Sequence, residues 1–302
     1  MLTPHSLFTS VAVAALVAAP APRPAPGPGL VATTTWLAQH LHDPNLVIVQ
    51  TGGREVYDQG HVPGARWISY DGLATGHDHG DGSLSMEMPA PAELTARLEK
   101  LGISDDSRIV VVYTEDWVEP STRIMLALQA AGLGEQSSWL DGGLGAWKRA
   151  GLPVSQDIPR VPAGHIARAR RQELVVDHDY VDALGRGRPG NHLVDARAPA
   201  FFNGPADQSR GMKGGHIPGA ASLPYNTVLG DDGTLLPPPA LEQLLRAAGI
   251  APADTVTAYC HVGAQATVVL FAARVLGHPI RLYDGSMEDW SRRNLPTEGA
   301  KP

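Results

Sequence analysis

The chain has 302 residues, a hydrophobic fraction of 43%, a charged fraction of 18% and a formal net charge of −7 at pH 7. This composition is that of a soluble globular protein with room for two ordinary domains, and it excludes a largely disordered chain. The acidic balance argues against a nucleic-acid partner, which favours a basic face. A single cysteine excludes an internal disulfide, so the fold depends on packing and Cys260 carries a free thiol.

Residues 1–29 form a candidate signal peptide followed by a Pro/Ala-rich linker. The segment LFTSVAVAALVAAPAPRPAPGPG combines an apolar run of the length of a signal-peptide core with small residues and prolines. The leader MLTPHS has no Lys or Arg, which export signals normally carry, so a disordered tail without an export role is the alternative. The apolar run is too short for a stable membrane span. We expect a periplasmic or secreted protein, with a cytoplasmic location as the alternative.

Three blocks of sequence occur twice in the same order. YDQGHVPGARWISY (57–70) returns as MKGGHIPGAASLPY (212–225), and LGISDDSRIVVVY (101–113) returns as AGIAPADTVTAY (248–259). DGGLGAWKRAGLPV (141–154) returns as DGSMEDWSRRNLPT (284–297). The repeats predict two copies of one domain of ordinary size. A proline-rich and basic segment at 155–176 marks the joint, so we expect domains at residues 30–157 and 158–302.

Within each half, apolar runs alternate with helical patterns. The predicted buried strands are 45–51, 108–113, 191–196 and 254–259. The predicted helices are 90–103 and 239–250, each preceded by proline and closed by glycine, and a third from about Ala266 to Leu276. The alternation predicts two α/β domains, each with a mostly parallel sheet flanked by helices. In such sheets, ligands gather at the carboxyl ends of the strands.

Cys260 stands at such a position, between the predicted strand 254–259 and the helix that starts near Ala266. The unpaired N–H groups and the positive end of a helix dipole favour an anion there, so the thiolate, which is the nucleophilic form, is favoured as well. Gly263 gives the backbone the freedom that a tightly curled loop needs. The alternative is an inert core cysteine, which would more often lie within a strand or helix than at their junction.

These features resemble the rhodanese family of sulfurtransferases in its two-domain form, over residues 30–297. YDQGHVPGA and MKGGHIPGA resemble the family's H-[IV]-P-G-A signature, once in each half. LDGGLGAW (140–147) and YDGSMEDW (283–290) resemble its C-terminal signature. CHVGAQA (260–266) resembles the active-site loop C-x-x-G-x-x-A. The resemblance implies two tandem rhodanese-like domains, of which the second is catalytic.

The resemblance also implies a reaction. Cys260 would take a sulfane sulfur from a small anionic donor, thiosulfate or 3-mercaptopyruvate, and pass it as a persulfide to a thiol or cyanide acceptor. No metal or organic cofactor is implied, and relatives of this form are often monomers. A non-catalytic persulfide carrier in a protein sulfur relay would have the same loop and remains an alternative. The residues whose backbone amides would cradle the persulfide charge are His261, Val262, Gly263, Ala264 and Gln265.

The first half lacks the cysteine and the compact glycine-containing loop. Aligning its strand RIVVVY with DTVTAY places Thr114 opposite Cys260. The carboxylates of Glu115 and Asp116 follow, and they would disfavour a bound anion. We therefore expect a non-catalytic domain that closes one wall of the cleft. Trp117 either reaches that cleft or serves packing alone.

The second half departs from the family's pattern at the donor site. His261 and Val262 stand where thiosulfate-preferring members carry basic residues and mercaptopyruvate-preferring members tend to have Gly-Ser. A protonated His261 would favour an anionic donor, unless the side chain points away. Phe201 stands where an anion-binding arginine is common. Arg210 and Lys213 are the remaining candidates for substrate binding, with solvated loop charges as the alternative.

Other polar residues favour structural roles. Each half has one histidine at this place in the repeat, His61 in the first and His216 in the second, although only the second half has the cysteine. We therefore predict that both make the same structural hydrogen bond. We predict that Asp195 and Arg197 form a structural ion pair. The histidines of GHDHGDG (76–82) are too few for a tetrahedral metal site, and no metal is expected.

Overall fold

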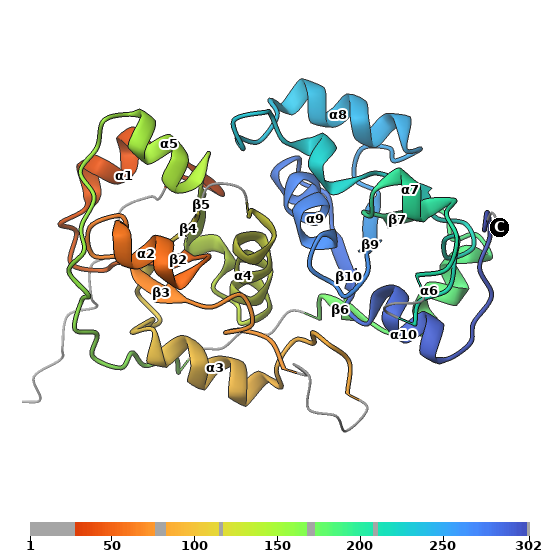
Figure 1. Cartoon of the computed structure of the whole chain (residues 1–302), viewed down its shortest axis with the longest axis horizontal. Helices are drawn as coiled ribbons and strands as arrows, with labels where there is room; N and C mark the ends of the chain where they lie inside the picture. The colour runs from red at the N-terminus through yellow and green to blue at the C-terminus, as the bar shows by residue number, and fades with distance from the viewer. Residues whose placement is uncertain (1–27, 76–82, 115–116, 168–172, 208–210, 301–302) are drawn as a thin grey trace, which may run out of the picture.

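The computed structural model describes residues 28–75, 83–114, 117–167, 173–207 and 211–300. Each half of the chain forms one five-stranded sheet in which all neighbouring strands are parallel (Figure 1). In the first sheet the strands are, in spatial order, β1 (Val31–Ala32), β5 (Ser137–Leu140), β4 (Arg108–Tyr113), β2 (Leu46–Thr51) and β3 (Arg66–Ile68). In the second they are β6 (Val175–Val176), β10 (Ile280–Tyr283), β9 (Thr255–Tyr259), β7 (Asn191–Asp195) and β8 (Ala221–Ser222). The predicted α/β class with mostly parallel sheets is confirmed.

Helices flank both sheets. Those of the first half are α1 (Thr34–His40), α2 (Arg54–Gln59), α3 (Pro91–Lys100), α4 (Glu119–Ala130) and α5 (Gly143–Arg149), with a 3₁₀ turn η1 (Gly134–Gln136). Those of the second half are α6 (His178–Gly185), α7 (Pro199–Phe202), α8 (Pro238–Ala247), α9 (Ala266–Val275) and α10 (Ser286–Arg292), with a 3₁₀ turn η2 (Tyr225–Val228). In the part of the chain that the structure describes, no helix has the length and apolar character needed to cross a bilayer.

The helices α3 and α8 occupy corresponding places and form for the same reasons. Each begins with a proline at its first position, where the missing N–H costs no hydrogen bond. Each buries two leucines that stand four residues apart, Leu94 and Leu98 in α3 and Leu241 and Leu245 in α8, so one face packs on the protein. The predicted range 90–103 ran past the end of α3 because the apolar pattern continues beyond the turn at Gly102, where φ is +71°.

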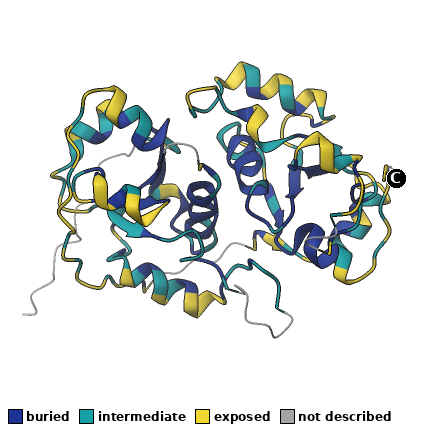
Figure 2. Ribbon diagram, viewed as in Figure 1, coloured by how far each residue is buried: buried dark blue, intermediate teal, exposed yellow. Residues whose placement is uncertain are grey.

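The helices α4 and α9 pack against each other between the two sheets (Figure 1). Both are buried along most of their length, so they form the centre of the interface between the halves (Figure 2). A helix that is covered on all sides is expected to be apolar all round, and α9 fits this expectation, whereas α4 also carries the buried charged side chain of Arg123. At the point of contact, the hydroxyl oxygens of Thr122 in α4 and Thr267 in α9 lie 2.8 Å apart and share a hydrogen bond.

One polar contact occurs twice across this interface. Asp284, which follows β10, accepts a hydrogen bond from the amide of Met88 at 2.6 Å. Asp141, which follows β5, accepts one from the amide of Leu235 at 2.8 Å. Met88 and Leu235 each stand three residues before the first residue of α3 and α8. The two halves therefore face each other through equivalent surfaces, related by an approximate two-fold axis.

Candidate active site

Cys260 follows β9 directly and opens a loop, residues 260–265, that leads into α9, as the sequence predicts. Its side chain is only 1% exposed. The backbone amide of Cys260 donates a hydrogen bond to the hydroxyl oxygen of Ser286 at 3.1 Å, and that hydroxyl donates to the carbonyl oxygen of Tyr283 at 2.9 Å. These two bonds attach the start of the loop to the turn between β10 and α10.

The carbonyl groups of the loop are held from outside. The carbonyl oxygen of Cys260 accepts from the amide of Met287, and that of His261 accepts from the amide of Glu288, both at 3.1 Å. Both donors belong to the first turn of α10, where amides have no partner within the helix. In a trans peptide, each N–H points away from the preceding carbonyl. Fixing these carbonyls outwards therefore turns the amides of His261 and Val262 towards the inner side of the loop.

The inner side of the loop carries unused hydrogen-bond donors. Among the residues that the structure describes, the amides of Val262, Gly263, Ala264 and Gln265 donate to no protein acceptor. Gly263 has a φ of +82°, a conformation that favours glycine, and a Cβ atom there would lie 2.5 Å from Oδ1 of Asp284. A curled backbone with inward amides is a concavity suited to an anion.

A buried ion pair connects this loop to the first half. Arg123 of α4, 1% exposed, contacts both carboxylate oxygens of Asp284, with Nη2 lying 3.0 Å from Oδ2. Nη1 of Arg123 also donates to the carbonyl oxygen of Gly263 at 3.2 Å. Burial by itself lowers the pKa of Arg123, but the charge of Asp284 and the hydrogen bonds to it outweigh burial and raise the pKa. Arg123 therefore stays charged, and neither member of this pair is among the predicted site residues.

A cavity of about 450 Å³ lies at the loop and is built from both halves of the chain. The first half contributes Tyr70, Trp117 and Glu119, so it closes one wall, as the sequence predicts. Trp117 is 40% exposed and stacks on Tyr70 with ring centroids 4.8 Å apart, so of its two predicted roles it takes the one in the cleft. The second half contributes Phe201, Asp207, Cys260, His261, Val262, Ala264 and Gln265.

His261 faces the cavity rather than pointing away from it. Its Nδ1 lies 3.3 Å from Oε1 of Gln265, and its ring meets the edge of Phe201 with centroids 4.6 Å apart. Phe201 thus occupies the wall at the place where the resemblance suggested an arginine. The carboxyl group of Glu119 lies on the opposite domain's wall, where burial raises its pKa and a hydrogen bond with Tyr225 opposes the rise.

The two predicted anion-binding side chains have different outcomes. Arg210 lies outside the described residues. Lys213 is described, and its Nζ donates to the carbonyl oxygen of Leu295 at 2.7 Å. Lys213 is not among the residues that line the cavity. Within the described residues, the cavity lining therefore contains no Lys or Arg, and it contains the acidic residues Glu119 and Asp207.

The two repeated histidines have the structural role that the sequence predicts. His61 donates through Nδ1 to the carbonyl oxygen of Tyr57, and His216 to that of Phe202, both at 2.8 Å. Each imidazole also stacks on the ring of the residue whose carbonyl it binds, with centroids 3.8 and 3.7 Å apart. Because the arrangement is the same in both halves, it belongs to the scaffold and not to the chemistry.

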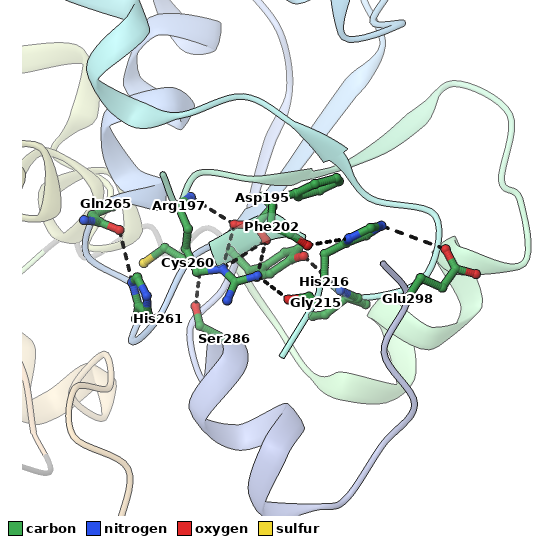
Figure 3. A network of polar contacts seen from close by, with 12 residues as sticks. Asp195, Arg197, Phe202, Gly215, His216, Cys260, His261, Gln265, Ser286 and Glu298 are labelled. Atoms are coloured by element: carbon green, nitrogen blue, oxygen red, sulfur yellow. Dashed lines mark hydrogen bonds and ion pairs between the residues drawn. The ribbon is translucent and has the colours of Figure 1, made fainter. Parts of the chain in front are cut away.

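The predicted ion pair between Asp195 and Arg197 is confirmed, with Nη2 of Arg197 lying 2.6 Å from Oδ2 of Asp195. Nη2 also donates to the carbonyl oxygen of Gly215 at 2.7 Å. Figure 3 shows this pair on one side of Cys260, with His261 and Gln265 on the other. The pair is buried and holds the segment after β7 in place behind the cysteine.

The first half has no nucleophile at the matching place. Thr114 follows β4 directly, as Cys260 follows β9. Glu115, Asp116 and the segment 76–82 lie outside the described residues. Across the described ranges, no three side chains of His, Cys, Asp or Glu lie close enough together to hold a metal ion.

The model of the rhodanese-like domain matches residues 33–150 and 178–293, once in each half. The chain belongs to the rhodanese-like family. The 3-mercaptopyruvate sulfurtransferase of Escherichia coli K12 is 32% identical over 279 residues, which cover 88% of this chain and 96% of that protein. The putative thiosulfate sulfurtransferase SseB of Mycobacterium tuberculosis is 34% identical over 240 residues, which cover 79% of this chain and 83% of that protein.

Among solved structures, SseA from Escherichia coli is similar to this rhodanese-family chain with a TM-score of 0.74 and 27% sequence identity. The match covers 85% of this chain and 98% of SseA. The fold and the family expected from the duplicated signatures are thus confirmed. This member of the family is a sulfurtransferase that works through a cysteine, and Cys260 is the one cysteine in the chain.

Proposed function

We propose that the chain moves a sulfane sulfur through a persulfide on Cys260 and that 3-mercaptopyruvate is a better donor than thiosulfate. The thiolate attacks the donor sulfur, the carbon–sulfur bond breaks, and its electron pair leaves with the pyruvate enolate. The proton of the mercapto group moves to the enolate, which yields pyruvate and an anionic persulfide. A thiol or cyanide acceptor then attacks the outer sulfur and regenerates the Cys260 thiolate.

The inward amides of the loop support this chemistry. The persulfide anion forms at the centre of the curl, and the amides of Val262, Gly263, Ala264 and Gln265 have no described protein acceptor that competes with it. Donors that are fixed before the reaction stabilise the charge without a cost of reorganisation. No metal or organic cofactor enters any step of this scheme.

The charge of the cavity supports the choice of donor. Thiosulfate carries two negative charges, whereas 3-mercaptopyruvate carries one, on its carboxylate, and pyruvate keeps that single charge when it leaves. The described lining includes the acidic residues Glu119 and Asp207 and, as its one basic residue, His261. A dianion meets more repulsion from Glu119 than a monoanion does. This observation carries the preference for the less charged donor.

The decisive experiment weighs the protein after incubation with each donor. We expect 3-mercaptopyruvate to add one sulfur atom to the wild type and none to Cys260→Ser. Sulfur on the Cys260→Ser variant, or no gain with either donor, would contradict the persulfide. Steady-state rates then compare the donors, and a higher kcat/KM with thiosulfate would contradict the preference. A protein that loads once and does not turn over with thiols or cyanide would be a persulfide carrier.

Phe201→Arg tests the same preference from the opposite direction. An arginine at this wall would add the anion-binding group that the described lining lacks, and Arg binds sulfonate-like oxygens through two parallel hydrogen bonds. We expect the variant to lower the KM for thiosulfate by about tenfold and that for 3-mercaptopyruvate by less. Phe201→Leu is the control for loss of the ring, and it should lower neither KM.

We also propose that the protein is exported and acts as a monomer. The apolar segment at the N-terminus, outside the described residues, supports export. The helices α4 and α9, which would otherwise be exposed apolar surfaces, already cover each other within one chain, and this supports the monomer. Mass spectrometry of the N-terminus of the mature protein tests export, since an intact Met1 would contradict it. Light scattering tests the monomer.

A further inference from the structure

Arg123 breaks the symmetry of the interface between the two halves. Thr122 and Thr267 each stand ten residues before the glycine of positive φ that follows their helix, Gly132 and Gly277, so the residue after Thr122 corresponds to the residue after Thr267. These residues are Arg123 and Val268. The contact of Asp284 with Met88 has its counterpart in the contact of Asp141 with Leu235, whereas among the described residues an arginine joins the contact on the side of Cys260 alone. The symmetric part of the interface therefore does not require Arg123.

The guanidinium group of Arg123 holds one peptide group of the catalytic loop. The carbonyls of Cys260 and His261 are held by α10, but the carbonyl of Gly263 is held by Arg123. Because the N–H of a trans peptide points away from its carbonyl, holding the Gly263 carbonyl turns the amide of Ala264 towards the inner side of the loop. Ala264 lines the cavity next to Cys260, whereas Arg123 does not reach it.

The electrostatic surroundings of Cys260 also include this guanidinium. The charged or titratable side chains that line the cavity or contact the loop are Tyr70, Glu119 and Arg123 from the first half, and Asp195, Arg197, Asp207, His261, Asp284 and Glu288 from the second. Of the arginines that the structure describes, Arg123 and Arg197 interact with the charge of Cys260, and each is paired with an aspartate. Because Asp284 offsets much of the charge of Arg123, the orientation of the peptide is the larger effect.

We propose that Arg123 is a positioning residue for sulfur transfer, supplied to the catalytic loop by the non-catalytic domain. It holds the Gly263–Ala264 peptide so that the Ala264 amide faces the anionic sulfur of Cys260. The role assigned to Arg123 rests on the persulfide chemistry proposed above. It gives the first domain a part in catalysis beyond closing a wall of the cavity.

The test compares Arg123→Met and Arg123→Lys with Asp141→Ala, which removes the mirror contact at the far side of the interface. Because the chain has one cysteine, alkylation by iodoacetamide reports on Cys260 alone and needs no sulfur donor. In Arg123→Met we expect the midpoint of the alkylation rate against pH to rise by about one unit, since the thiolate loses an oriented donor and a nearby cation. We expect kcat to fall about tenfold with KM within about twofold, since Arg123 does not line the cavity.

Arg123→Lys keeps the charge but cannot hold Asp284 and the Gly263 carbonyl with one planar group, so its kcat should lie between those of the wild type and Arg123→Met. Asp141→Ala should keep the wild-type midpoint and kcat. The proposal is overturned if Arg123→Met keeps both values, or if Asp141→Ala changes them equally. If Arg123→Met does not fold, a wild-type kcat in Arg123→Lys overturns it. A wild type that gains no sulfur would refute the persulfide chemistry, while the alkylation profiles would still report on Arg123.

Discussion

Thr122 and Thr267 meet across the interface of the two halves with their hydroxyl oxygens 2.8 Å apart. The two threonines are equivalent residues of two copies of one domain, so their contact lies where the approximate two-fold axis crosses the interface. The residues around this point differ between the two copies. One copy has a cysteine and the other a threonine after the central strand, and one copy has an arginine where the other has a valine. Catalysis depends on those differences.

Gly263→Ala should abolish most of the activity. The residue has a φ of +82° and a Cβ would lie 2.5 Å from Asp284, so the loop must shift. Gly277→Ala is a matched control, because Gly277 has a φ of +86° and no atom within 4 Å of the place of a Cβ. Both variants should lose about 1–2 kcal/mol of stability from backbone strain, as measured by chemical denaturation. Only Gly263→Ala should lose kcat, and an equal loss in both would contradict the role of the loop.

Asp284→Ala should destabilise the protein by about 3–5 kcal/mol, because it leaves the guanidinium of Arg123 buried without its partner. Adding Arg123→Met should recover part of this loss, since the unpaired charge is then removed as well. Chemical denaturation of the two single variants and the double variant measures the coupling. Additive losses would mean that the two side chains do not act as a pair.

Glu119→Gln should lower the KM for an anionic donor. Burial raises the pKa of Glu119, so its carboxylate takes up a proton at a higher pH than an exposed glutamate does. The cavity therefore loses a negative charge as the pH falls, and in the wild type the KM for the donor should fall with it. Glu119→Gln removes the charge at every pH, which should lower KM about two- to fivefold at pH 8 and flatten its dependence on pH.

The control for this effect is Glu242→Gln, which changes an exposed carboxylate of α8 with an exposed arginine as its neighbour. It should leave KM and its pH dependence as they are in the wild type. If Glu119→Gln shows the same dependence of KM on pH as the wild type, then Glu119 does not repel the donor.

Arg210→Ala should raise the KM for the preferred donor if Arg210, which lies outside the described residues, binds the anionic donor as the sequence predicts. Lys213→Ala should leave KM unchanged, because the Lys213 ammonium donates to the Leu295 carbonyl and not to the cavity. Steady-state kinetics of both variants make the comparison. An unchanged KM in Arg210→Ala would remove that residue from the site, and a raised KM in Lys213→Ala would place that residue in it.

The sequence predicts those features that depend on local pattern or on repetition. The strand before Cys260 and the helix after it are found where the apolar runs place them, since a buried strand and an apolar helix are readable from a few residues. The structural role of His61 and His216 was predictable because the duplication supplies an internal comparison. The same comparison identified the first half as the domain without a nucleophile.

The contacts between the halves were not predictable from local pattern. The available signal was Arg123 itself, a charged residue within the otherwise apolar run STRIMLALQAA of α4. A charge in such a helix needs a buried partner, but nothing in the sequence says that the partner is Asp284, on the other domain. The same holds for Tyr70, which reaches the cavity only because the two halves face each other. Lys213 is the opposite case. Its place near the signature motif favours anion binding, but its ammonium group donates to the backbone carbonyl oxygen of Leu295.

The mirrored contacts of Asp284 and Asp141 have a consequence for what a single chain makes possible. In a homodimer with an isologous interface, every residue appears at both ends of the interface, so an arginine next to one cysteine would also stand next to the other. With both copies in one polypeptide, each end can carry its own residue. A single catalytic centre can then draw its nucleophile from one copy and its supporting cation from the other, a division of labour that identical subunits cannot achieve.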